Sequence, residues 1–423
     1  MNNSIEKKLL TRRFGFIDPM SIEDYIASGG YEALRKAVES TPEAIIEEVK
    51  ASGLRGRGGA AFPMGLKMEM VSKAKGDMKY LICNADEGEP GNFKDRYLME
   101  NDPHQIIEGI AISAYAVGAV KGYIFIRGEY TRSIYVMEAA VMAARKKGFL
   151  GKRILGSGAD FDIEIYTGGG SYVCGEEFAL MLCIEGNPGR STFKPPFPTA
   201  EGLYGKPTQI NNVESFANLP HIIQDGAQAY SSIGTKHSKG TKLVSLSGNV
   251  REKGLFEVPF GVHLWEIIEN LGRGVPGSSI RMVQLGGASG PCLPPKMLGI
   301  KLDYKDLADN DMSMGSGAVI VIDSTHDVLD IVRNTLEFFR HESCGKCTPC
   351  REGIVHLLVL LDRFILGEAE KKDLELLRTL IETVEETSIC GLGQAAPTSL
   401  KTTLKYFPEL YAAGIKKHRS RAI

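Results

Sequence analysis

The chain has 423 residues, and its 50 Lys and Arg against 52 Asp and Glu give a formal net charge of −2. Non-specific nucleic-acid binding needs a basic field, so this balance argues against a nucleic-acid-binding protein. The content of 43% hydrophobic and 24% charged residues is that of a globular protein and excludes a wholly disordered or fibrous chain. At roughly 150 residues per domain, the length predicts two to four domains.

The chain has no sequence signal for membrane insertion or secretion. No uninterrupted apolar run reaches the ~18 residues of a membrane span. The first residues, MNNSIEKKLLTRR, lack the apolar core of a signal peptide. We therefore expect a cytoplasmic protein without a span of its own, held peripherally at the cytoplasmic face of a membrane only through its complex.

The first 50 residues predict helices, followed by a glycine-rich segment. Thr41 before Pro42 is typical of an N-cap with proline at the first helical position, and Gly53 is a suitable end for that helix. Residues 54–65, LRGRGGAAFPMG, then combine glycines with two arginines.

The next stretch alternates predicted strands and helices. The expected strands are 79–83, 123–127 and 161–166, and the expected helices are 104–120, 132–147 and one that starts near Gly175. This β-α-β-α-β order predicts a parallel, helix-covered sheet, whose ligands bind beyond the carboxyl ends of the strands. NADEGEPGNFKDR and GGGSYVCGEE each follow a strand, so we expect both at that edge.

The remainder of the chain changes character twice. Residues 186–207 are rich in proline and glycine and predict a loop. From about Lys242, short strands (KLVSLSG, RMVQL and AVIVI) and one helix around Trp265 predict a small α+β domain. From about Asp327 the chain is almost wholly helical.

Four cysteines give the strongest chemical signal. Cys344, Cys347 and Cys350 form C-x2-C-x2-C, and Cys390 follows after 39 intervening residues. Three thiolates at this spacing fit one corner of a [4Fe–4S] cluster that a distant fourth completes. A zinc site, which more often uses two separated C-x2-C pairs or Cys/His mixtures, and a set of inert buried thiols are the alternatives. His341 lies close in sequence, and we expect it to be a surface or outer residue rather than a ligand.

The segment RGRGGAAFPMG matches neither common phosphate-binding fingerprint. It lacks the GK[ST] of a P-loop, and it does not close a strand as the dinucleotide motif does. Arg55, Arg57, the free backbone N–H groups and Lys67 suit an anionic ligand, and Phe62 suits stacking on a planar ring. A simple turn is the alternative.

Three further loops carry polar residues with alternative explanations. Asp86, Glu87 and Glu89 suit ribose hydroxyls or ring nitrogens, although a charge run is usually a solvated surface. Glu176 and Glu177 stand at a predicted helix start, where they also satisfy the helix dipole. In NNVE, Asn211 is a candidate cap with Glu214 three residues later, and Asn212 is left for a ligand contact.

Six motifs follow one another along the chain: RGRGGAAFPMG, NADEGEPG, GGGSYVCGEE, NNVE, ESCGKCTPCREG and SICGLG. In this order they resemble the NADH-binding flavoprotein subunit of respiratory complex I (the 51-kDa type). They also resemble its relatives, the diaphorase subunits of NAD-dependent hydrogenases and formate dehydrogenases. The resemblance covers about residues 20–410. It implies an α/β fold with four parts: an N-terminal helical segment with the glycine-rich loop (1–70), a Rossmann-like FMN/NADH domain (71–240), a ubiquitin-like β-grasp domain (241–326) and a helical bundle with a [4Fe–4S] cluster (327–423).

The resemblance also implies the site residues. The flavin pocket would comprise Gly56, Gly58, Lys67, Asn84, Asp86, Tyr172, Gly175, Glu176, Asn211 and Asn212. The nicotinamide nucleotide would lie near Glu89 and Glu177, with its adenine between Phe62 and Phe197. The cluster ligands would be Cys344, Cys347, Cys350 and Cys390, and no catalytic side chain would act on the hydride, which passes directly to FMN.

The implied activity is NADH oxidation of the NADH:quinone oxidoreductase type. A hydride passes from NADH to FMN, and single electrons then reach the [4Fe–4S] cluster and a partner. In the family the partners are a thioredoxin-like [2Fe–2S] subunit and a larger iron–sulfur subunit. The alternative parent is a soluble NAD-dependent or electron-bifurcating hydrogenase or formate dehydrogenase, which CGKCTPCREG and CGLGQAAP resemble slightly more. A zinc-stabilised scaffold and a ferredoxin-linked membrane electron carrier are the rivals from other classes, and an absorption spectrum separates the redox protein from the scaffold.

Overall fold

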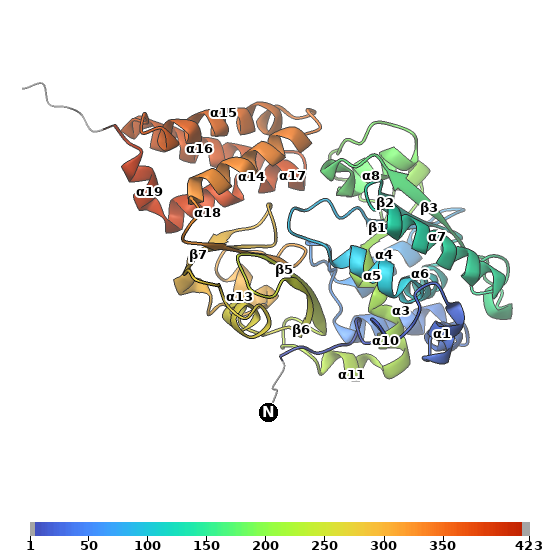
Figure 1. The fold of residues 1–423 in the computed structure, drawn as a ribbon. Coiled ribbons are helices and arrows are strands. Elements are labelled where there is room, and N and C mark those ends of the chain that lie inside the picture. Colours follow the sequence, from blue (N-terminus) through green and yellow to red (C-terminus); the bar gives the residue numbers. More distant parts are fainter. Residues whose placement is uncertain (1–4, 417–423) are drawn as a thin grey trace, which may run out of the picture.

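The computed structural model describes residues 5–416. Figure 1 shows a helix-covered parallel sheet in blue to green, a second sheet in yellow, and a bundle of orange to red helices above the second sheet. The expected α/β class with a Rossmann-like part, a β-grasp part and a helical C-terminal part is confirmed. The residue limits of the four domains stay a prediction.

The chain starts with short helices, as the sequence predicts. Thr41 caps α3, because its side chain accepts a hydrogen bond from the N–H of Ala44 at 3.2 Å. Gly53 ends that helix with φ 70°, a left-handed conformation that glycine adopts without a steric penalty. The helices of this part are α1 (Ile22–Ala27), α2 (Glu32–Val38), α3 (Pro42–Ser52) and α4 (Met64–Lys73).

The first sheet has four parallel strands in the order β3-β2-β1-β4. Three of them were predicted, whereas the strand that contains NN of NNVE was not. Because β2 and β4 flank β1 on opposite sides, the connections diverge at β1 and leave a crevice at the carboxyl ends of β1 and β4. The strands are β1 (Tyr80–Ala85), β2 (Lys121–Arg127), β3 (Asp162–Gly168) and β4 (Thr208–Asn212).

Alternate side chains of this sheet enter two different cores. Leu81 and Cys83 of β1 pack in the core under α6 and α7, whereas Ile82 between them packs on the other face with α8. The second core continues into the C-terminal helices, so that sheet and bundle share buried apolar side chains. The remaining helices here are α5 (Lys94–Asn101), α6 (Pro103–Val117), α7 (Thr131–Lys146), α8 (Glu177–Ile184), α9 (Val213–Ala217), α10 (Leu219–Asp225) and α11 (Ala227–Ser231), with short 3-10 turns at Ile154–Gly156, Tyr172–Gly175 and Leu203–Gly205.

The second sheet has the order β6-β5-β9-β7-β8, with β5 and β9 parallel at its centre and antiparallel pairs outside. A helical segment crosses it, consisting of α12 (Leu264–Glu266) and a π-helical turn (Ile267–Leu271) where the sequence predicts a helix around Trp265. The other elements are β5 (Thr241–Gly248), β6 (Gly254–Pro259), β7 (Ile280–Leu285), β8 (Cys292–Leu293), a 3-10 turn (Pro295–Met297), α13 (Tyr304–Ala308) and β9 (Ala318–Asp323).

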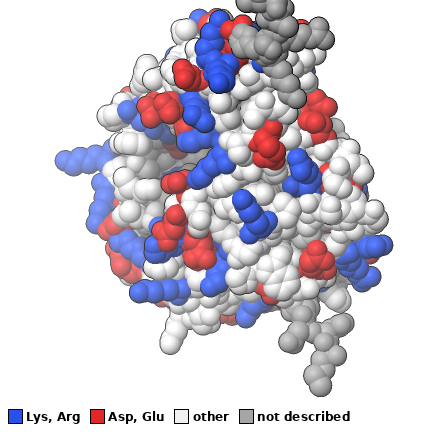
Figure 2. All heavy atoms as spheres, turned by 90° about the vertical axis from the view of Figure 1, so that its left-hand side faces the viewer, with Lys and Arg blue, Asp and Glu red and all other residues white. Residues whose placement is uncertain are grey.

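Between Asp327 and residue 416 the chain is mostly helical, as predicted, and the Asp327 carboxylate caps the first of these helices, α14. Its helices are α14 (Val328–Glu342), α15 (Thr348–Ile365), α16 (Lys371–Thr387), α17 (Gly391–Ala395), α18 (Thr398–Tyr406) and α19 (Pro408–Ala413). Within residues 5–416, no helix has the length and apolar character required to cross a bilayer. Figure 2 shows basic and acidic side chains interspersed over the face of the molecule that the C-terminal helices and the second sheet form.

Candidate functional site

Two adjoining cavities, of about 270 Å³ and 350 Å³, lie at the crevice between the ends of β1 and β4. Asn84 and Asn212 pair in register at these strand ends, and both line both cavities. We call the cavity that Lys67 and Glu177 line the first cavity, and the one that Asp86 and Glu89 line the second cavity. The walls that they share are formed by Gly58, Ala60, Asn84, Gly175, Glu176, Asn212 and Gly391.

The glycine-rich loop closes the first cavity by lying close to β4. The N–H of Gly56 donates to the carbonyl of Phe62 at 2.9 Å, which folds the loop back on itself. A Cβ at Gly58 would lie 2.9 Å from Cβ of Asn212, so a larger residue there would push the loop off the strand end. Gly56, Gly58 and Phe62 line the first cavity, and their contacts with the flavin and the adenine stay predictions.

The two arginines of this loop do not face the cavities, and the expectation that they meet an anionic ligand there is wrong. The Arg57 side chain is buried and donates to the hydroxyl of Tyr230 at 3.0 Å and to the carbonyl of Lys239 at 2.7 Å. Arg55 lies with its guanidinium 5.4 Å from the centre of the Tyr304 ring. Sequence spacing did not reveal that this loop turns its arginines toward the second sheet.

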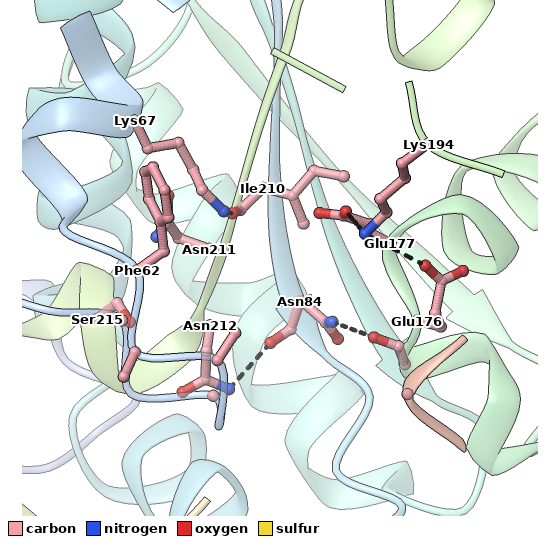
Figure 3. Close-up of a pocket in the computed structure, with 16 residues that line it drawn as sticks. Phe62, Lys67, Asn84, Glu176, Glu177, Lys194, Ile210, Asn211, Asn212 and Ser215 are labelled. Carbon is pink, nitrogen blue, oxygen red and sulfur yellow. Dashed lines mark hydrogen bonds and ion pairs between the residues drawn. The ribbon is translucent and has the colours of Figure 1, made fainter. Parts of the chain in front are cut away.

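Lys67 provides a positive charge in the wall of the first cavity, on the side that the glycine-rich loop forms. Its Nζ donates to the carbonyl of Ile210 at 2.9 Å and lies 5.9 Å from the centre of the Phe62 ring. Burial lowers the pKa of this ammonium. Figure 3 shows Lys67 and Phe62 on one side of the cavity and Lys194 with Glu177 on the other. An anionic ligand in the first cavity would therefore meet a lysine on either side.

Asn212, and not Asn211, caps the helix after β4, so the expected capping box on Asn211 is wrong. The Asn212 Oδ1 accepts from the N–H of Glu214 at 3.1 Å and from Lys94 Nζ at 2.8 Å. Its Nδ2 donates to Asp95 at 2.6 Å. Both ends of the amide thus bond within the protein, which fixes the strand end against the glycine loop. Asn211 lines the first cavity, and its Oδ1 accepts from Gln209 at 3.0 Å.

The acidic loop after β1 places Asp86 and Glu89 in the second cavity. Asp86 Oδ2 is buried and has no hydrogen-bond partner among the described residues. Burial raises the Asp86 pKa to about 7, although Arg127 lowers it, and Glu129 adds to the increase. An unpartnered buried carboxyl oxygen at a cavity wall fits a polar ligand that donates a hydrogen bond.

Glu87 also lines the second cavity, but its carboxylate bonds within the protein. Its carboxylate accepts from the N–H groups of Asp95 at 3.0 Å and Arg96 at 3.1 Å, at the start of α5. Burial and, to a smaller extent, the neighbouring Asp95 carboxylate raise the Glu87 pKa to about 7. The solvated-surface explanation of this charge run is therefore wrong, since the loop is folded into the protein.

Glu176 and Glu177 divide two tasks at the start of α8. Glu176 Oε2 accepts from the N–H groups of Phe178 and Ala179, both at 3.1 Å, so this residue is the helix cap. Glu177 forms an ion pair with Lys194 instead. Tyr172 and Gly175 precede them and line the second cavity, and Gly175 also lines the first. Phe197 lines neither cavity, and its side chain is 52% exposed; its proposed contact with adenine stays a prediction.

A buried cluster of charges supports the site from below, and the sequence did not predict it. Glu214 lies between the ammonium groups of Lys242 and Lys94, and its Oε2 is 3.2 Å from Lys94 Nζ. Lys94 Nζ also pairs with Asp95 Oδ1 at 2.6 Å. All four side chains are nearly inaccessible. Because Lys94 and Asp95 also hold Asn212, the cluster fixes the edge of both cavities. The only sequence signal was charged residues next to apolar strand and helix positions.

The four predicted cluster cysteines converge beside the cavities. Cys350 is buried, and Cys344, Cys347 and Cys390 pack as partly buried side chains against the same core. Burial raises the Cys350 pKa to about 11, the Ser343 hydroxyl at 3.2 Å lowers it, and the other three thiols raise it. Cys347 and Cys390 stand at the N-caps of α15 and α17.

Four thiolates are the donor set of an iron–sulfur cluster. Within residues 5–416, no group of three or more His, Cys, Asp or Glu side chains is placed to hold one metal ion. In a [4Fe–4S] cluster each thiolate binds a different iron, so the four sulfur atoms stand further apart than around one zinc. His341 is exposed and lies beside Glu337 and Arg340, as expected for a surface residue.

Cys390 connects the cysteine group with the cavities. The next residue, Gly391, lines both cavities, and Leu392 lines the second. The cysteine group and the shared wall of the two cavities are therefore neighbours in the chain. The remaining thiols, Cys83, Cys174, Cys183 and Cys292, lie outside this group.

A parallel sheet with a cavity at its switch point suits a nucleotide-like cofactor, and four thiols beside it suit an iron–sulfur cluster. Comparisons with known proteins agree. Residues 49–221 match the family described as Nuo51 FMN-binding domain, and residues 330–414 match the NADH-ubiquinone oxidoreductase-F iron-sulfur binding region.

Similar proteins come from two kinds of complex. The chain is 47% identical over 414 residues to the NADP-reducing hydrogenase subunit HndC of Solidesulfovibrio fructosivorans, covering 97% of this chain and 84% of that one. It is also 47% identical over 413 residues to an NADH-quinone oxidoreductase subunit of Rhizobium meliloti (strain 1021), covering 97% and 98%. A crystal structure of an NAD+-reducing [NiFe]-hydrogenase in the H2-reduced state superposes with a TM-score of 0.86 at 33% identity, over 99% of this chain and 68% of that chain.

The chain belongs to the family of NADH-oxidising flavoprotein subunits of the complex I 51-kDa type, with FMN and a [4Fe–4S] cluster as cofactors and NADH as substrate. It is a component of a multi-subunit NADH dehydrogenase or hydrogenase assembly. The expected family, cofactors and enzyme class are thereby confirmed.

Proposed function

We propose that the two cavities together hold FMN and the nicotinamide nucleotide, and that Cys344, Cys347, Cys350 and Cys390 bind the cluster that takes the electrons onward. The observation that supports this proposal most is the position of Gly391, which lines both cavities and directly follows Cys390 in the chain. When bound, FMN accepts a hydride as an electron pair and releases single electrons, which is the conversion that an iron–sulfur acceptor requires.

The residues of the first cavity bind the cofactor and the nucleotide and orient them. Lys67 and the backbone N–H groups of the glycine-rich loop provide positive charge and donors for a phosphate group. Gly58 lets this loop approach the strand ends, and Asn212 and the buried charges beneath it keep that distance fixed. Glu177 and Lys194 form the opposite wall, where a nucleotide ribose would meet them.

The residues of the second cavity provide acceptors near the reacting rings. The Asp86 carboxyl has a free oxygen at the wall, and Glu89 is held by hydrogen bonds from neighbouring segments. A carboxylate beside the nicotinamide favours the positive charge that its ring gains when the hydride leaves. No acid or base is needed for the hydride itself, so these side chains position the rings and exclude water.

Electrons must leave the chain through a partner, because the chain itself holds no further electron acceptor beyond its single cluster. We propose the family arrangement, in which a thioredoxin-like [2Fe–2S] subunit and a larger iron–sulfur subunit of the same complex receive them. The location would be the cytoplasm, with peripheral attachment to the cytoplasmic face of the membrane through the complex.

A second candidate parent is a soluble NAD-dependent or electron-bifurcating hydrogenase or formate dehydrogenase. Two observations favour it: the 47% identity to HndC and the superposition on the hydrogenase chain. Affinity purification of the native chain, followed by identification of the subunits that remain bound in stoichiometric amounts, separates the two. Quinone-reductase subunits would support the first assignment, and hydrogenase or formate dehydrogenase subunits would support the second.

The activity itself is tested with the isolated chain, loaded anaerobically with FMN, iron and sulfide. We expect the flavin absorption to bleach on addition of NADH, and ferricyanide reduction to proceed at the expense of NADH. A protein that binds FMN and iron but leaves NADH unoxidised would overturn the proposed function.

A further inference from the structure

The second sheet contributes a serine to the nucleotide site. Ser289 lies in the loop between β7 and β8, 200 residues from Glu89, yet both line the second cavity. The backbone N–H of Ser289 donates to Glu89 Oε1 at 2.8 Å, and its hydroxyl donates to Oε2 at 2.9 Å. One residue thus holds both carboxylate oxygens.

A third donor comes from another segment. The Tyr172 hydroxyl donates to Glu89 Oε2 at 2.7 Å. The carboxylate therefore bridges the loop after β1, the turn before α8 and the second sheet. Burial raises the Glu89 pKa, and the hydrogen bonds from Ser289 and Tyr172 to its carboxylate offset part of this rise.

The loop of Ser289 is shaped for this close approach. Gly287 has φ 91°, and a Cβ there would lie 2.5 Å from Cγ of Glu89. At Gly290, a Cβ would lie 1.7 Å from the carbonyl oxygen of Leu285. Any side chain at either position would displace the loop, so the two glycines keep Ser289 within bonding distance.

We propose that Ser289 is a positioning residue for the NADH reaction: it orients the Glu89 carboxylate toward the nicotinamide position, so that the second sheet completes the site built on the first. The inference rests on the proposed function, in which the nicotinamide lies near Glu89. A fixed carboxylate favours the cationic ring of NAD+ over a ligand that has no such ring.

The test compares two ligands by calorimetry on the FMN-loaded protein. NAD+ carries the positively charged ring, whereas ADP-ribose has the rest of the molecule without it. Ser289→Ala should weaken NAD+ binding about tenfold, the usual size of one hydrogen bond to a charged group, and leave ADP-ribose binding unchanged. Ser289→Thr, which keeps a hydroxyl, should restore most of the NAD+ affinity.

Gly287→Ala is a second test that leaves the Ser289 side chain in place. By displacing the loop, it should weaken NAD+ binding at least as much as Ser289→Ala and again spare ADP-ribose. Ser278→Ala is the matched control, because the Ser278 hydroxyl contacts only Ser324 at an exposed position of the same sheet region. It should leave both affinities unchanged.

Two results would overturn the inference: unchanged affinities for both NAD+ and ADP-ribose in Ser289→Ala and Gly287→Ala, or a loss of affinity that is equal for the two ligands. Either would leave Ser289 as a residue of the fold alone. If the unaltered protein bound ADP-ribose and NAD+ equally and did not oxidise NADH, the proposed function would fail instead, which distinguishes the two failures.

Discussion

Glu177 and Lys194 form an ion pair in the wall of the first cavity, although 17 residues separate them in the chain. Glu177 stands in the first turn of α8, and Lys194 comes from the proline-rich loop beyond it. Figure 3 shows the lysine side chain reaching across to the carboxylate. The negative charge that we expect to select the nucleotide is therefore accompanied by a positive one.

This pair leads to a prediction on nucleotide choice. The Glu177 carboxylate can accept a hydrogen bond from the ribose 2′-hydroxyl of NADH and would repel the 2′-phosphate of NADPH. Glu177→Gln removes the repulsion and leaves the Lys194 ammonium with Glu176, at 4.0 Å, as its remaining ion-pair partner. We expect the use of NADPH relative to NADH to rise roughly ten- to a hundred-fold, or about 1–3 kcal/mol. The values of kcat/KM for both nucleotides measure it.

The double variant Glu177→Gln with Lys194→Met separates the two charges. If the exposed lysine attracts the phosphate, most of the gain seen in Glu177→Gln should disappear. An unchanged NADH to NADPH ratio in folded, flavin-loaded Glu177→Gln would instead leave Glu177 as a helix-dipole residue, worth about 0.3–1 kcal/mol of stability.

The second prediction concerns the cluster. Cys390→Ser should weaken or remove the [4Fe–4S] signal, because a serine hydroxyl is a poor ligand for iron in place of a thiolate. FMN binding and NADH oxidation by an artificial acceptor should largely remain, since hydride transfer precedes the cluster. Electron paramagnetic resonance and iron analysis of the reduced protein measure the change.

Cys183→Ser is the matched control for that variant. Cys183 lies with its Sγ 3.5 Å from Sγ of Cys174, outside the group of four. Its replacement should leave the iron content unchanged. Loss of iron in Cys183→Ser but not in Cys390→Ser would show that the ligand assignment is wrong.

The elements of the fold that the sequence predicted best are those with strong local signals. The strand LIC within β1 and the cap Thr41 follow from apolar runs and capping chemistry, which act over a few residues. The order of motifs along the chain predicted the family and its cofactors. In contrast, β4 is short and contains two asparagines, so its place at the edge of the sheet beside β1 came from tertiary packing and not from propensity.

The details of the site were less predictable, because side-chain direction depends on distant contacts. Arg57 has the same local sequence signal as a phosphate-binding arginine, but Tyr230 and Lys239 draw it into the protein. The shift of the cap from Asn211 to Asn212 depends on where β4 ends. Ser289 has no signal at all in its own segment, since its partner Glu89 lies 200 residues away.

The third prediction concerns the buried charges below the cavities. Burial alone would raise the Glu214 pKa, but Lys242 and Lys94 lower it below its usual value, so the side chain is held as a carboxylate. Glu214→Gln leaves the Lys242 ammonium buried without an anionic partner. We expect a loss of about 3–5 kcal/mol in the free energy of unfolding, measured by urea denaturation of the FMN-free protein.

Glu32→Gln is the control for this loss. Glu32 pairs with Arg35 at 3.4 Å on the surface, where about half of each side chain is exposed. Its replacement should change stability by less than about 1 kcal/mol. Equal effects of the two variants would contradict the structural importance of the buried cluster.

The last prediction follows from the raised pKa of Asp86, about 7 in the folded protein against an ordinary 3.8. The folded state binds the proton more tightly than the unfolded state, so in the FMN-free protein the contribution of Asp86 to stability falls as pH rises from about 4 to 7 and is constant above that range. Three pH units correspond to at most about 4 kcal/mol. Asp86→Asn keeps the shape and cannot ionise, so it should become the more stable protein as pH increases.

Because Glu87 titrates in both proteins, the difference between their unfolding free energies at each pH isolates Asp86. A difference that stays constant between pH 4 and 8 would mean that the carboxyl is ionised without penalty, and that its unpartnered oxygen is not a binding group held ready for a hydrogen-bond donor of the flavin.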